Sequence, residues 1–275
     1  MTPIPYDMRE VLLSINHVSH SFQDRVVLRD VNGVIRNVHR DHINQGQVVA
    51  LLGPSGLGKT TLLHVLAGLL RPSSGQVLIT EAQRPIKRGE VGVVTQECRL
   101  FQHRTVRQNL YLAARLAKMS RDDAKNKTAY YLDLFHMTAH AEAYPVQLSG
   151  GQRQRVAIAQ QLLCSSYFLL MDEPFSGLDV NVKEEVCQLI TEVAQLDELK
   201  TIIVVTHDTR AAIQVADTIW LLGRDRTPAG EIIPGARIMD EIDLKARGLA
   251  WQPNLKQLPE FETCVREIEA RFKNL

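Results

Sequence analysis

The sequence predicts an α/β fold with a mainly parallel sheet, an antiparallel β front and an inserted helical subdomain. Four short, continuous apolar runs recur along the chain, at residues 48–52, 91–94, 168–171 and 202–205. Such runs are expected of strands that are buried on both faces of a parallel sheet. Segments with the apolar spacing of helices separate the runs, and this alternation is typical of α/β domains.

Two β-rich stretches near the beginning of the chain predict an antiparallel hairpin. They cover residues 11–15 and 26–28, and the polar residues Gln23, Asp24 and Arg25 separate them, as in a turn between two strands. Residues 37–47 are polar, and we expect them to form a loop that leads into the first buried strand.

Helical spacing replaces the strand pattern between residues 97 and 147, which predicts the inserted helical subdomain. The apolar positions that show this spacing are Val106, Leu110, Leu112, Leu116, Tyr131, Leu132, Leu134 and Phe135. A final amphipathic helix is predicted near the end of the chain, where apolar residues fall on one helical face. These residues are Phe261, Cys264, Val265, Ile268 and Phe272, with Glu260 and Glu262 before them and Arg271 and Lys273 at the end.

The composition allows one large compact unit and disfavours a nucleic-acid partner. The 275 residues suffice for a sizeable core, and 32 Lys and Arg against 31 Asp and Glu give a net charge of +1. The start lacks a basic region followed by an apolar stretch, and no apolar run approaches the ~20 residues of a membrane span. We therefore expect the chain to stay in the cytoplasm. Four distant cysteines predict reduced structural thiols rather than a disulfide framework or a zinc ribbon: Cys98, Cys164, Cys187 and Cys264.

A phosphate-binding loop is predicted directly after the first buried strand. Residues 53–60 fit the pattern G-x-x-x-x-G-K-S/T, placed between a strand and a helix. Glycines let the backbone aim successive N–H groups at phosphate oxygens, and the helix N-terminus adds partial positive charge. We expect Lys59 to reach the β- and γ-phosphates and Thr60 to bind Mg²⁺. The nucleotide-binding residues predicted here are Gly53, Pro54, Ser55, Gly56, Leu57, Gly58, Lys59, Thr60 and Thr61.

Two carboxylates, Asp172 and Glu173, follow the third apolar run. Ligands of open α/β sheets bind at the carboxyl ends of the strands, so this is a suitable place for a reactive site. We expect Asp172 to hold the magnesium ion, directly or through water. Glu173 can orient the water that attacks the γ-phosphate, or accept its proton. The alternative is that both acids only cap the turn at Pro174, but the phosphate loop upstream disfavours it.

The sequence Leu148-Ser149-Gly150-Gly151-Gln152 stands between the phosphate loop and the two carboxylates. A Ser-Gly-Gly turn before a helix is ordinary by itself, because serine is a good N-cap and glycine is common in turns. In this order of motifs, however, the pentapeptide resembles the signature sequence of ABC ATPases. The resemblance runs from about residue 11 to residue 223 and covers most of the chain.

The resemblance implies roles for several further residues. Gln96 is similar to the Q-loop glutamine, which senses magnesium and the attacking water, and His207 is similar to the switch histidine at the γ-phosphate. Asp179 ends a sequence, 176–179, that resembles the D-loop, which contacts the opposite subunit. Phe22 stands where the family has an aromatic residue that stacks on adenine. The resemblance thus implies catalytic Glu173, His207 and Gln96, magnesium ligands Thr60, Gln96 and Asp172, and nucleotide contacts from Phe22, Ser149, Gly150, Gly151, Gln152 and Asp179.

One segment departs from the family pattern. The link at residues 33–45 is longer than usual and contains His39, Asp41 and His42. These three residues could be metal ligands, but nothing else of a metal site accompanies them, so we expect a polar surface loop. By the resemblance, residues 1–225 form the ABC ATPase domain, with the helical subdomain at about 97–163. Residues 226–275 form a C-terminal extension with the amphipathic helix.

The resemblance implies an ATPase that works as a dimer with ATP and Mg²⁺. In the family, the signature of one subunit completes the ATP site of another, and this chain holds one phosphate loop and one signature. We therefore expect Ser149 and Gly151 to reach the γ-phosphate that is held by Lys59 of a second copy or a close paralogue. ATP binding then favours the closed dimer, and hydrolysis removes contacts that hold it closed.

The implied function is that of the ATP-binding subunit of an ABC transporter, at the cytoplasmic face of the cell membrane, with a separate integral membrane permease. Residues 100–110 and the tail around 248–251 resemble bacterial importers of the nitrate, sulfonate and taurine group. This implies a bacterial importer of small anions, with an external solute-binding protein. The alternatives are the ATPase of an exporter or of a lipid or lipoprotein transport system. A soluble ABC ATPase is disfavoured, because neither a coiled-coil insertion nor a second cassette occurs.

Overall fold

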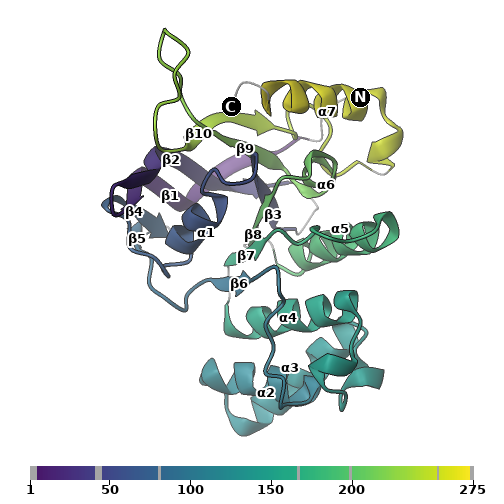
Figure 1. Cartoon of the computed structure of the whole chain (residues 1–275). Helices are drawn as coiled ribbons and strands as arrows, with labels where there is room; N and C mark the ends of the chain where they lie inside the picture. The colour runs from purple at the N-terminus through teal and green to yellow at the C-terminus, as the bar shows by residue number, and fades with distance from the viewer. Residues whose placement is uncertain are drawn as a thin grey trace.

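The computed structural model describes residues 5–40, 45–79, 82–165, 168–197, 200–252 and 254–272. Its strands are β1 (Asp7–Phe22), β2 (Arg25–His39), β3 (Gln47–Leu52), β4 (Ser74–Ile79), β5 (Arg84–Pro85), β6 (Gly92–Val94), β7 (Phe168–Asp172), β8 (Thr201–Thr206), β9 (Thr218–Gly223) and β10 (Arg237–Asp243). Its α-helices are α1 (Lys59–Leu66), α2 (Val106–Leu116), α3 (Arg121–Leu134), α4 (Gly150–Cys164), α5 (Val180–Ala194), α6 (Thr209–Val215) and α7 (Pro259–Phe272). Figure 1 shows α2, α3 and α4 at one end of the molecule and α7 at the other.

The central sheet has six strands in the order β10-β9-β3-β8-β7-β6. All pairs are parallel except β10 with β9, which confirms the predicted mainly parallel sheet. Every residue of β3, β8 and β9 is buried. The strand β9 was not predicted, because only two residues separate it from α6, so that the apolar pattern of the helix continues directly into that of the strand.

Alternate residues of β3 contribute to two different apolar clusters, because successive side chains of a strand point to opposite faces. Val49 and Leu51 belong to the cluster that includes α1 and the antiparallel sheet. Ala50 and Leu52 belong to the cluster that includes α4, α5, α6 and α7. Both faces of the central sheet are therefore covered, which explains why its strands appear in the sequence as continuous apolar runs.

The second sheet is antiparallel, in the order β2-β1-β4-β5, which confirms the predicted β front. Its β1–β2 hairpin is longer than predicted, since the register runs from Phe22↔Arg25 to Asp7↔His39. The expectation of a loop from residue 37 was wrong for residues 37–39, which are the end of β2. Polar side chains there do not prevent pairing, because the backbone makes the ladder and only one face of this sheet packs on the core. Asp41 and His42 lie outside the described residues.

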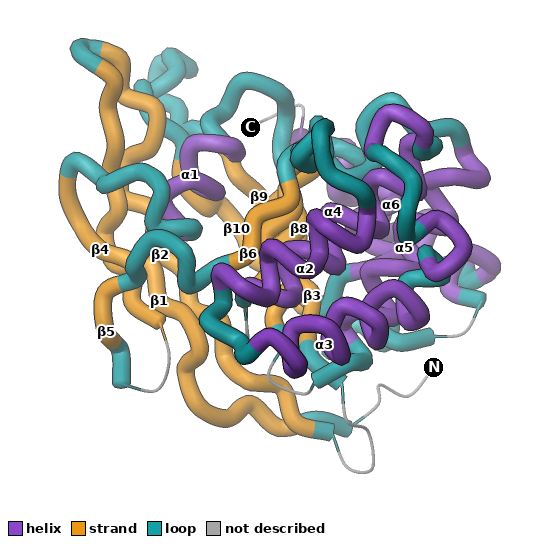
Figure 2. Tube along the Cα trace, turned by 90° about the horizontal axis from the view of Figure 1, so that it is seen from below, coloured by secondary structure: helices purple, strands orange, loops and turns teal. Residues whose placement is uncertain are grey.

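The inserted helical region contains α2, α3 and α4, which pack together (Figure 2). Two of these helices begin with a capping box, in which the N-cap side chain and the N3 side chain satisfy each other's backbone N–H groups. Thr105 and Gln108 form the box of α2, and Ser149 and Gln152 form the box of α4. The signature sequence is thus the start of a well-capped helix.

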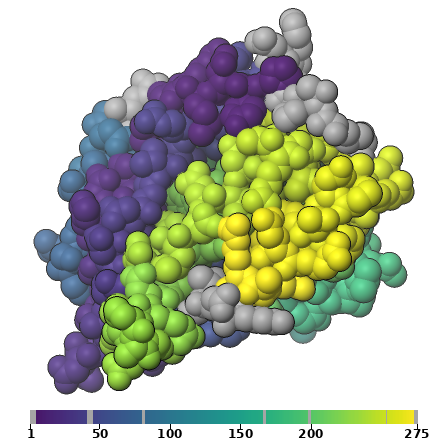
Figure 3. Space-filling model, turned by 90° about the horizontal axis from the view of Figure 1, so that it is seen from above, coloured from purple at the N-terminus to yellow at the C-terminus, as the bar shows by residue number. Residues whose placement is uncertain are grey.

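The C-terminal strand β10 and helix α7 pack onto the rest of the structure. β10 pairs with β9 along the edge of the central sheet, and α7 lies against α6, where Arg210 makes two 2.7 Å hydrogen bonds to Glu262. Figure 3 shows α7, in yellow, beside the yellow-green segment that contains β10. The apolar face of α7 is buried through Phe261, Cys264, Val265 and Ile268. Within the described ranges, no helix is both long and apolar enough to cross a membrane, and the four cysteines are free.

Candidate active site

The phosphate loop joins the end of β3 to the start of α1. Gly58 has φ 94°, a left-handed conformation that favours glycine. A methyl group at this position would lie 2.6 Å from Val27 Cγ1, so a side chain there would collide with β2. The loop therefore turns tightly against the front sheet and places Lys59 and Thr60 in the first turn of α1.

Lys59 is held above the loop that precedes it. Its Nζ donates hydrogen bonds to Gly53 O at 2.8 Å and Pro54 O at 3.1 Å, and it lies 3.5 Å from Glu173 Oε1. Burial lowers the pKa of Lys59, and the nearby Glu173 carboxylate opposes this shift. The ammonium group is thus a buried cation at the N-terminus of a helix. The cation and the helix N-terminus both favour the binding of an anion at this place.

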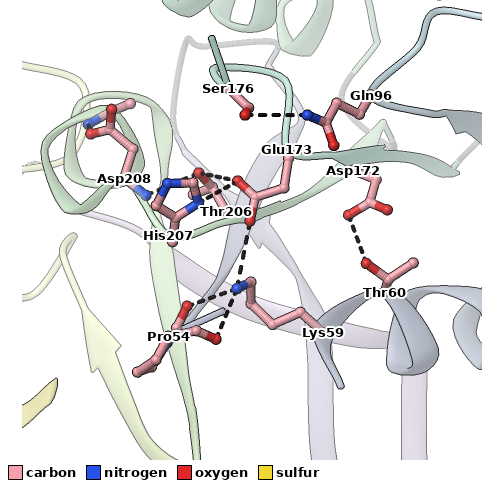
Figure 4. A network of polar contacts seen from close by, with 12 residues as sticks. Pro54, Lys59, Thr60, Gln96, Asp172, Glu173, Ser176, Thr206, His207 and Asp208 are labelled. Atoms are coloured by element: carbon pink, nitrogen blue, oxygen red, sulfur yellow. Dashed lines mark hydrogen bonds and ion pairs between the residues drawn. The ribbon is translucent and has the colours of Figure 1, made fainter. Parts of the chain in front are cut away.

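Glu173 connects the phosphate loop to the end of β8 (Figure 4). Its Oε2 accepts a hydrogen bond from Thr206 Oγ1 at 3.3 Å and lies 2.9 Å from His207 Nδ1. Its backbone has φ 48°, an uncommon conformation for a residue other than glycine. The Glu173 N–H donates to Val205 O at 2.8 Å, which ties this turn to the neighbouring strand. The carboxylate is therefore fixed between Lys59 and His207.

Asp172, the last residue of β7, faces Thr60. Their side-chain oxygens, Asp172 Oδ1 and Thr60 Oγ1, are 3.3 Å apart. Burial raises the pKa of Asp172, while the hydrogen bond from Thr60 opposes the rise. A carboxylate and a hydroxyl that lie this close are hard oxygen donors of the kind that magnesium prefers, so the residues present fit a magnesium ion.

Gln96 borders the same region. It lines a pocket together with Asp172 and Glu173, and its Nε2 donates to Ser176 Oγ at 3.2 Å. An amide oxygen such as that of Gln96 is also a hard oxygen donor of the kind that magnesium accepts. The structure therefore brings together Lys59, Thr60, Gln96, Asp172, Glu173 and His207, which come from four separate parts of the sequence.

Three predicted nucleotide contacts do not join this cluster within the chain. Ser149 uses its hydroxyl and its N–H in bonds with Gln152 at 3.2 and 2.9 Å. Asp179 is the N-cap of α5 and accepts hydrogen bonds from the N–H groups of two residues in its own first turn. Phe22 lies at the tip of the β1–β2 hairpin with 51% of its surface exposed, and its ring packs edge-on against His20.

Sequence reasoning missed three residues that the structure places around Glu173. Thr206 donates to Glu173, Asp208 N donates to Thr206 Oγ1 at 3.1 Å, and Lys183 Nζ donates to Asp208 Oδ2 at 2.7 Å. Asp208 had a readable signal, because an aspartate directly before a helical segment is a preferred N-cap. Lys183 had none, since a lysine on a helix is ordinary.

Comparison with known proteins assigns a family to this geometry. The ABC transporter family model matches residues 37–176, about half of the chain. This chain belongs to the ABC transporter family of ATP-binding proteins. The predicted resemblance and the α/β fold with a phosphate loop are thereby confirmed.

Relatives of this ABC protein include ATP-binding subunits of importers. The nitrate import ATP-binding protein NrtD of Synechocystis sp. is 39% identical over 244 residues, which cover 87% of this chain and 88% of that protein. The sulfate/thiosulfate import ATP-binding protein CysA of Thermosynechococcus vestitus is 38% identical over 215 residues, or 77% of this chain. The matched region spans only 61% of that CysA.

Two solved structures share the fold of this ABC protein. CbiO1 from Clostridium perfringens, part of the ABC transporter complex cbiONQ, has a TM-score of 0.72 and 25% identity, and the match covers 96% of this chain and 97% of that one. An ATP-binding cassette in a dimeric post-hydrolysis state, bound to ADP and Pi, has a TM-score of 0.66 and 26% identity, with 85% and 99% covered.

Proposed function

We propose that this chain hydrolyses ATP as the ATP-binding subunit of an ABC importer. The observation that carries the proposal is the position of the Glu173 carboxylate, 3.5 Å from Lys59 Nζ and 2.9 Å from His207 Nδ1. A carboxylate beside the cation that holds the γ-phosphate is well placed to orient water for in-line attack and to accept its proton.

The remaining residues of the site position the nucleotide. The N–H groups of the phosphate loop and the Lys59 ammonium bind the β- and γ-phosphates, and Phe22 offers an exposed ring on which adenine can stack. Thr60, Asp172 and Gln96 hold the magnesium ion, which neutralises phosphate charge when it is bound. His207 contacts the γ-phosphate from the end of β8. Phosphate release by the purified chain, with ATP and Mg²⁺, tests this assignment directly.

We further propose that two copies of the chain, or this chain and a close paralogue, enclose the nucleotide. Ser149 and Gly151 lie at the N-terminus of α4, and the hydrogen bonds of Ser149 stay within that turn. They are therefore proposed to serve the γ-phosphate of the partner subunit. The dimeric ADP- and Pi-bound relative supports this arrangement.

A mixing experiment tests the composite site. A Lys59→Ala chain and a Ser149→Arg chain should each be inactive alone, because every site of either homodimer lacks one half. A mixed dimer holds one intact site, so an equimolar mixture should recover up to about a quarter of the wild-type turnover. No recovery in mixtures that form folded heterodimers would contradict the proposal. Thermal unfolding of each variant checks that the folds are intact.

The partner at the membrane is proposed to be a separate integral permease that docks on the helical region. A groove between α2 and α4 is lined by Leu100, Phe101, Leu116 and Cys164, among others. Phe101 and Leu116 are 43% and 67% exposed. The groove wall is rigid, because the buried Asn109 side chain bonds the backbone of residues 101, 104 and 105. Exposed apolar side chains on a rigid wall suit a protein partner.

Co-purification from membranes tests this partner and the proposed position at the cytoplasmic face of the cell membrane. The chain should be recovered with an integral membrane protein, and Leu116→Glu should release it without changing the intrinsic rate of ATP hydrolysis. A fully active chain that never associates with a membrane protein would favour the soluble class.

The cargo is proposed to be a small anion, delivered by an external solute-binding protein. This rests on the names of the two importer relatives, which concern nitrate and sulfate or thiosulfate. Uptake of labelled nitrate, sulfate and sulfonates by cells with and without the gene tests the proposal. Unchanged uptake of all three, with a defect in export or in lipid transport, would favour the alternatives.

We propose that residues 1–225 are the ATPase domain, with a helical subdomain at about 97–163, and that 226–275 extend it. The pairing of β10 with β9 and the packing of α7 on α6 support an extension that folds onto the ATPase domain. A chain truncated after residue 225 should therefore lose stability, because the edge of β9 and the face of α6 become exposed.

A further inference from the structure

The three consecutive residues Thr206, His207 and Asp208 contact both ends of one segment, which runs from Glu173 to Lys183 in the first turn of α5. Glu173, at the start of the segment, contacts Thr206 and His207. Lys183, at its end, donates to Asp208 Oδ2 at 2.7 Å. The segment 173–183 is thus closed by side-chain contacts to a single tripeptide at the end of β8 (Figure 4 shows the Glu173 side of this closure).

The Asp208 end of the closure is well defined. Asp208 is the N-cap of α6, and its Oδ1 accepts a hydrogen bond from Ala211 N at 3.0 Å. The other oxygen, Oδ2, receives the Lys183 ammonium. Burial raises the pKa of Asp208, but the Ala211 N–H and Lys183 outweigh it and hold the pKa below its usual range. The Asp208 carboxylate therefore joins α5 to the first turn of α6, directly after His207 in the chain.

The closed segment also carries Ser176, which lines the pocket with Glu173, and Asp179. Ser176 accepts a hydrogen bond from Gln96 at 3.2 Å, and Asp179 caps α5 one turn before Lys183. Next to Asp179, the Val180 side chain is 80% exposed. Asp179 and Val180 form an exposed corner of the molecule. If this corner moves, the contacts of Glu173 and Lys183 transmit the shift to residues 206–208, because packed interiors transmit small displacements.

We propose that Lys183 and Asp208 form a positioning pair that couples the exposed corner at Asp179 to His207 and Glu173. The proposal rests on the proposed ATPase function, in which a second copy of the chain meets this corner. When the partner presses on Asp179, α5 moves and Lys183 pulls on Asp208, which sets the position of His207 beside the γ-phosphate. Hydrolysis then depends on dimer closure through this pair, although neither residue touches the nucleotide.

The pair is expected to matter for rate more than for stability. Its side chains are 37% and 21% exposed, and exposed ion pairs contribute little to the free energy of unfolding. Positioning effects are larger, since a displacement of about 1 Å in a catalytic group can cost on the order of 10²-fold in rate. A purely structural salt bridge would show the opposite pattern.

The test uses the full chain and the variants Lys183→Met, Asp208→Asn and Lys183→Arg. Asparagine is as good an N-cap as aspartate, so Asp208→Asn removes the charge and keeps the cap of α6. Lys125→Met, on the exposed surface of α3, is the matched control for loss of a lysine. The measurements are kcat, KM, the Hill coefficient for ATP, the Kd of ATP without magnesium and the unfolding temperature.

Lys183→Met and Asp208→Asn should each lower kcat by about tenfold and reduce the Hill coefficient, with the Kd of ATP changed less than about twofold. The double variant should be no slower than either single variant, because both break one interaction. Lys183→Arg should restore most of the rate.

Two outcomes overturn the inference. An unchanged kcat in Lys183→Met means that the pair is not coupled to catalysis. A fall in kcat that is matched by a lower unfolding temperature and by additive losses in the double variant means that the pair is only structural. If the wild-type chain itself does not hydrolyse ATP, the proposed function fails instead, so the two failures are distinguishable.

Discussion

The carboxyl ends of the central strands lie along one side of the sheet and their amino ends along the opposite side, here called the carboxyl edge and the amino edge. Both edges hold buried charges, but they differ in how fully those charges are paired. At the carboxyl edge, Lys59 and Glu173 stand 3.5 Å apart beside an open pocket. At the amino edge, Asp217 is 2% exposed and accepts a 2.6 Å hydrogen bond from Val48 N. At both edges a charged group is removed from water, but the surrounding residues compensate for its burial in two different ways.

The amino edge is sealed by residues from the end of the chain. Lys245 Nζ donates to Thr218 Oγ1 at 2.7 Å and Asp217 O at 3.3 Å, and it lies 3.2 Å from Asp243 Oδ1. The Arg40 guanidinium stacks 3.7 Å over the Trp251 ring, a cation–π contact that helps to hold a buried cation. This edge joins β2, β3, β9 and the C-terminal segment through these contacts. We conclude that it serves stability.

At the carboxyl edge, by contrast, Lys59 and Glu173 form a 3.5 Å ion pair beside a pocket. Sites of this kind commonly sacrifice stability for activity. Substitutions at the two edges should therefore have opposite signatures, and the following predictions test that contrast.

The largest effect is expected for Glu173→Gln. Turnover should fall by about 10²- to 10⁴-fold, because glutamine cannot accept the proton from water, while ATP remains bound and an ATP-bound dimer accumulates. Phosphate release and size-exclusion chromatography with ATP measure these effects. Glu185→Gln, an exposed position on α5, is the control. Unchanged phosphate release would remove Glu173 from its catalytic role.

At the amino edge, Lys245→Met should destabilise the fold and leave catalysis intact. Removing the ammonium breaks its ion pair with Asp243 and its bond to Thr218, and it takes away a cation that stabilises the buried Asp217 carboxylate. Leaving a buried charge uncompensated costs about 3 kcal/mol or more. Chemical denaturation measures the loss. Lys256→Met removes a lysine from the exposed pair with Glu184 and should cost less than about 1 kcal/mol. A catalytic defect in folded Lys245→Met would break the contrast between the edges.

Asp217→Asn should reveal a pH dependence of stability that belongs to the amino edge. Burial raises the pKa of Asp217 from 3.8 to about 6, against the opposing effects of Val48 N–H, Lys245 and Arg40. The stability that Asp217 contributes is therefore complete below pH 3.8 and lost as the pH rises through about 6. Relative to Asp217→Asn, the wild type should lose about 3 kcal/mol between pH 3.5 and pH 7. A constant difference across this range would show that folding does not raise the pKa of Asp217.

The smallest of these effects, in free energy, is expected for Lys59→Ala, which should weaken ATP binding by about tenfold or more. The unfolding temperature should change little or rise, because a buried cation with a lowered pKa is removed. Titration with a fluorescent ATP analogue measures the affinity, and Lys125→Ala is the control. Normal ATP binding by Lys59→Ala would count against the phosphate loop.

The parts of the fold that were predictable from sequence are those with local patterns. The four apolar runs became β3, β6, β7 and β8, because a strand that is buried on both faces must be apolar at every position. The strand β10 was not predicted, since most of its residues are only partly buried and an edge strand needs no continuous apolar run. The end of β2 was missed because Asn37 and His39 are polar, although β2 is an edge strand whose pairing depends on the backbone.

In the candidate site too, only the residues that belong to a local motif were predictable from the sequence. The phosphate loop and the two carboxylates were readable because each is a short motif whose residues are neighbours in the chain. Thr206, Asp208 and Lys183 were not, because they act through partners that are distant in the sequence. Lys183 and Asp208 are 25 positions apart, and no spacing rule links a helix surface to a loop on another element.

By itself, the sequence located a phosphate loop at residues 53–60, a signature sequence at Ser149 and two carboxylates at the end of a strand. These features depend on backbone conformation and local residue type, which act over a few positions. Only the tertiary structure decided that Glu173 lies between Lys59 and His207, that Lys183 pairs with Asp208, and that Asp217 is sealed. Such pairings depend on which elements become neighbours, and that is set by how the sheets and helices bury their apolar faces together.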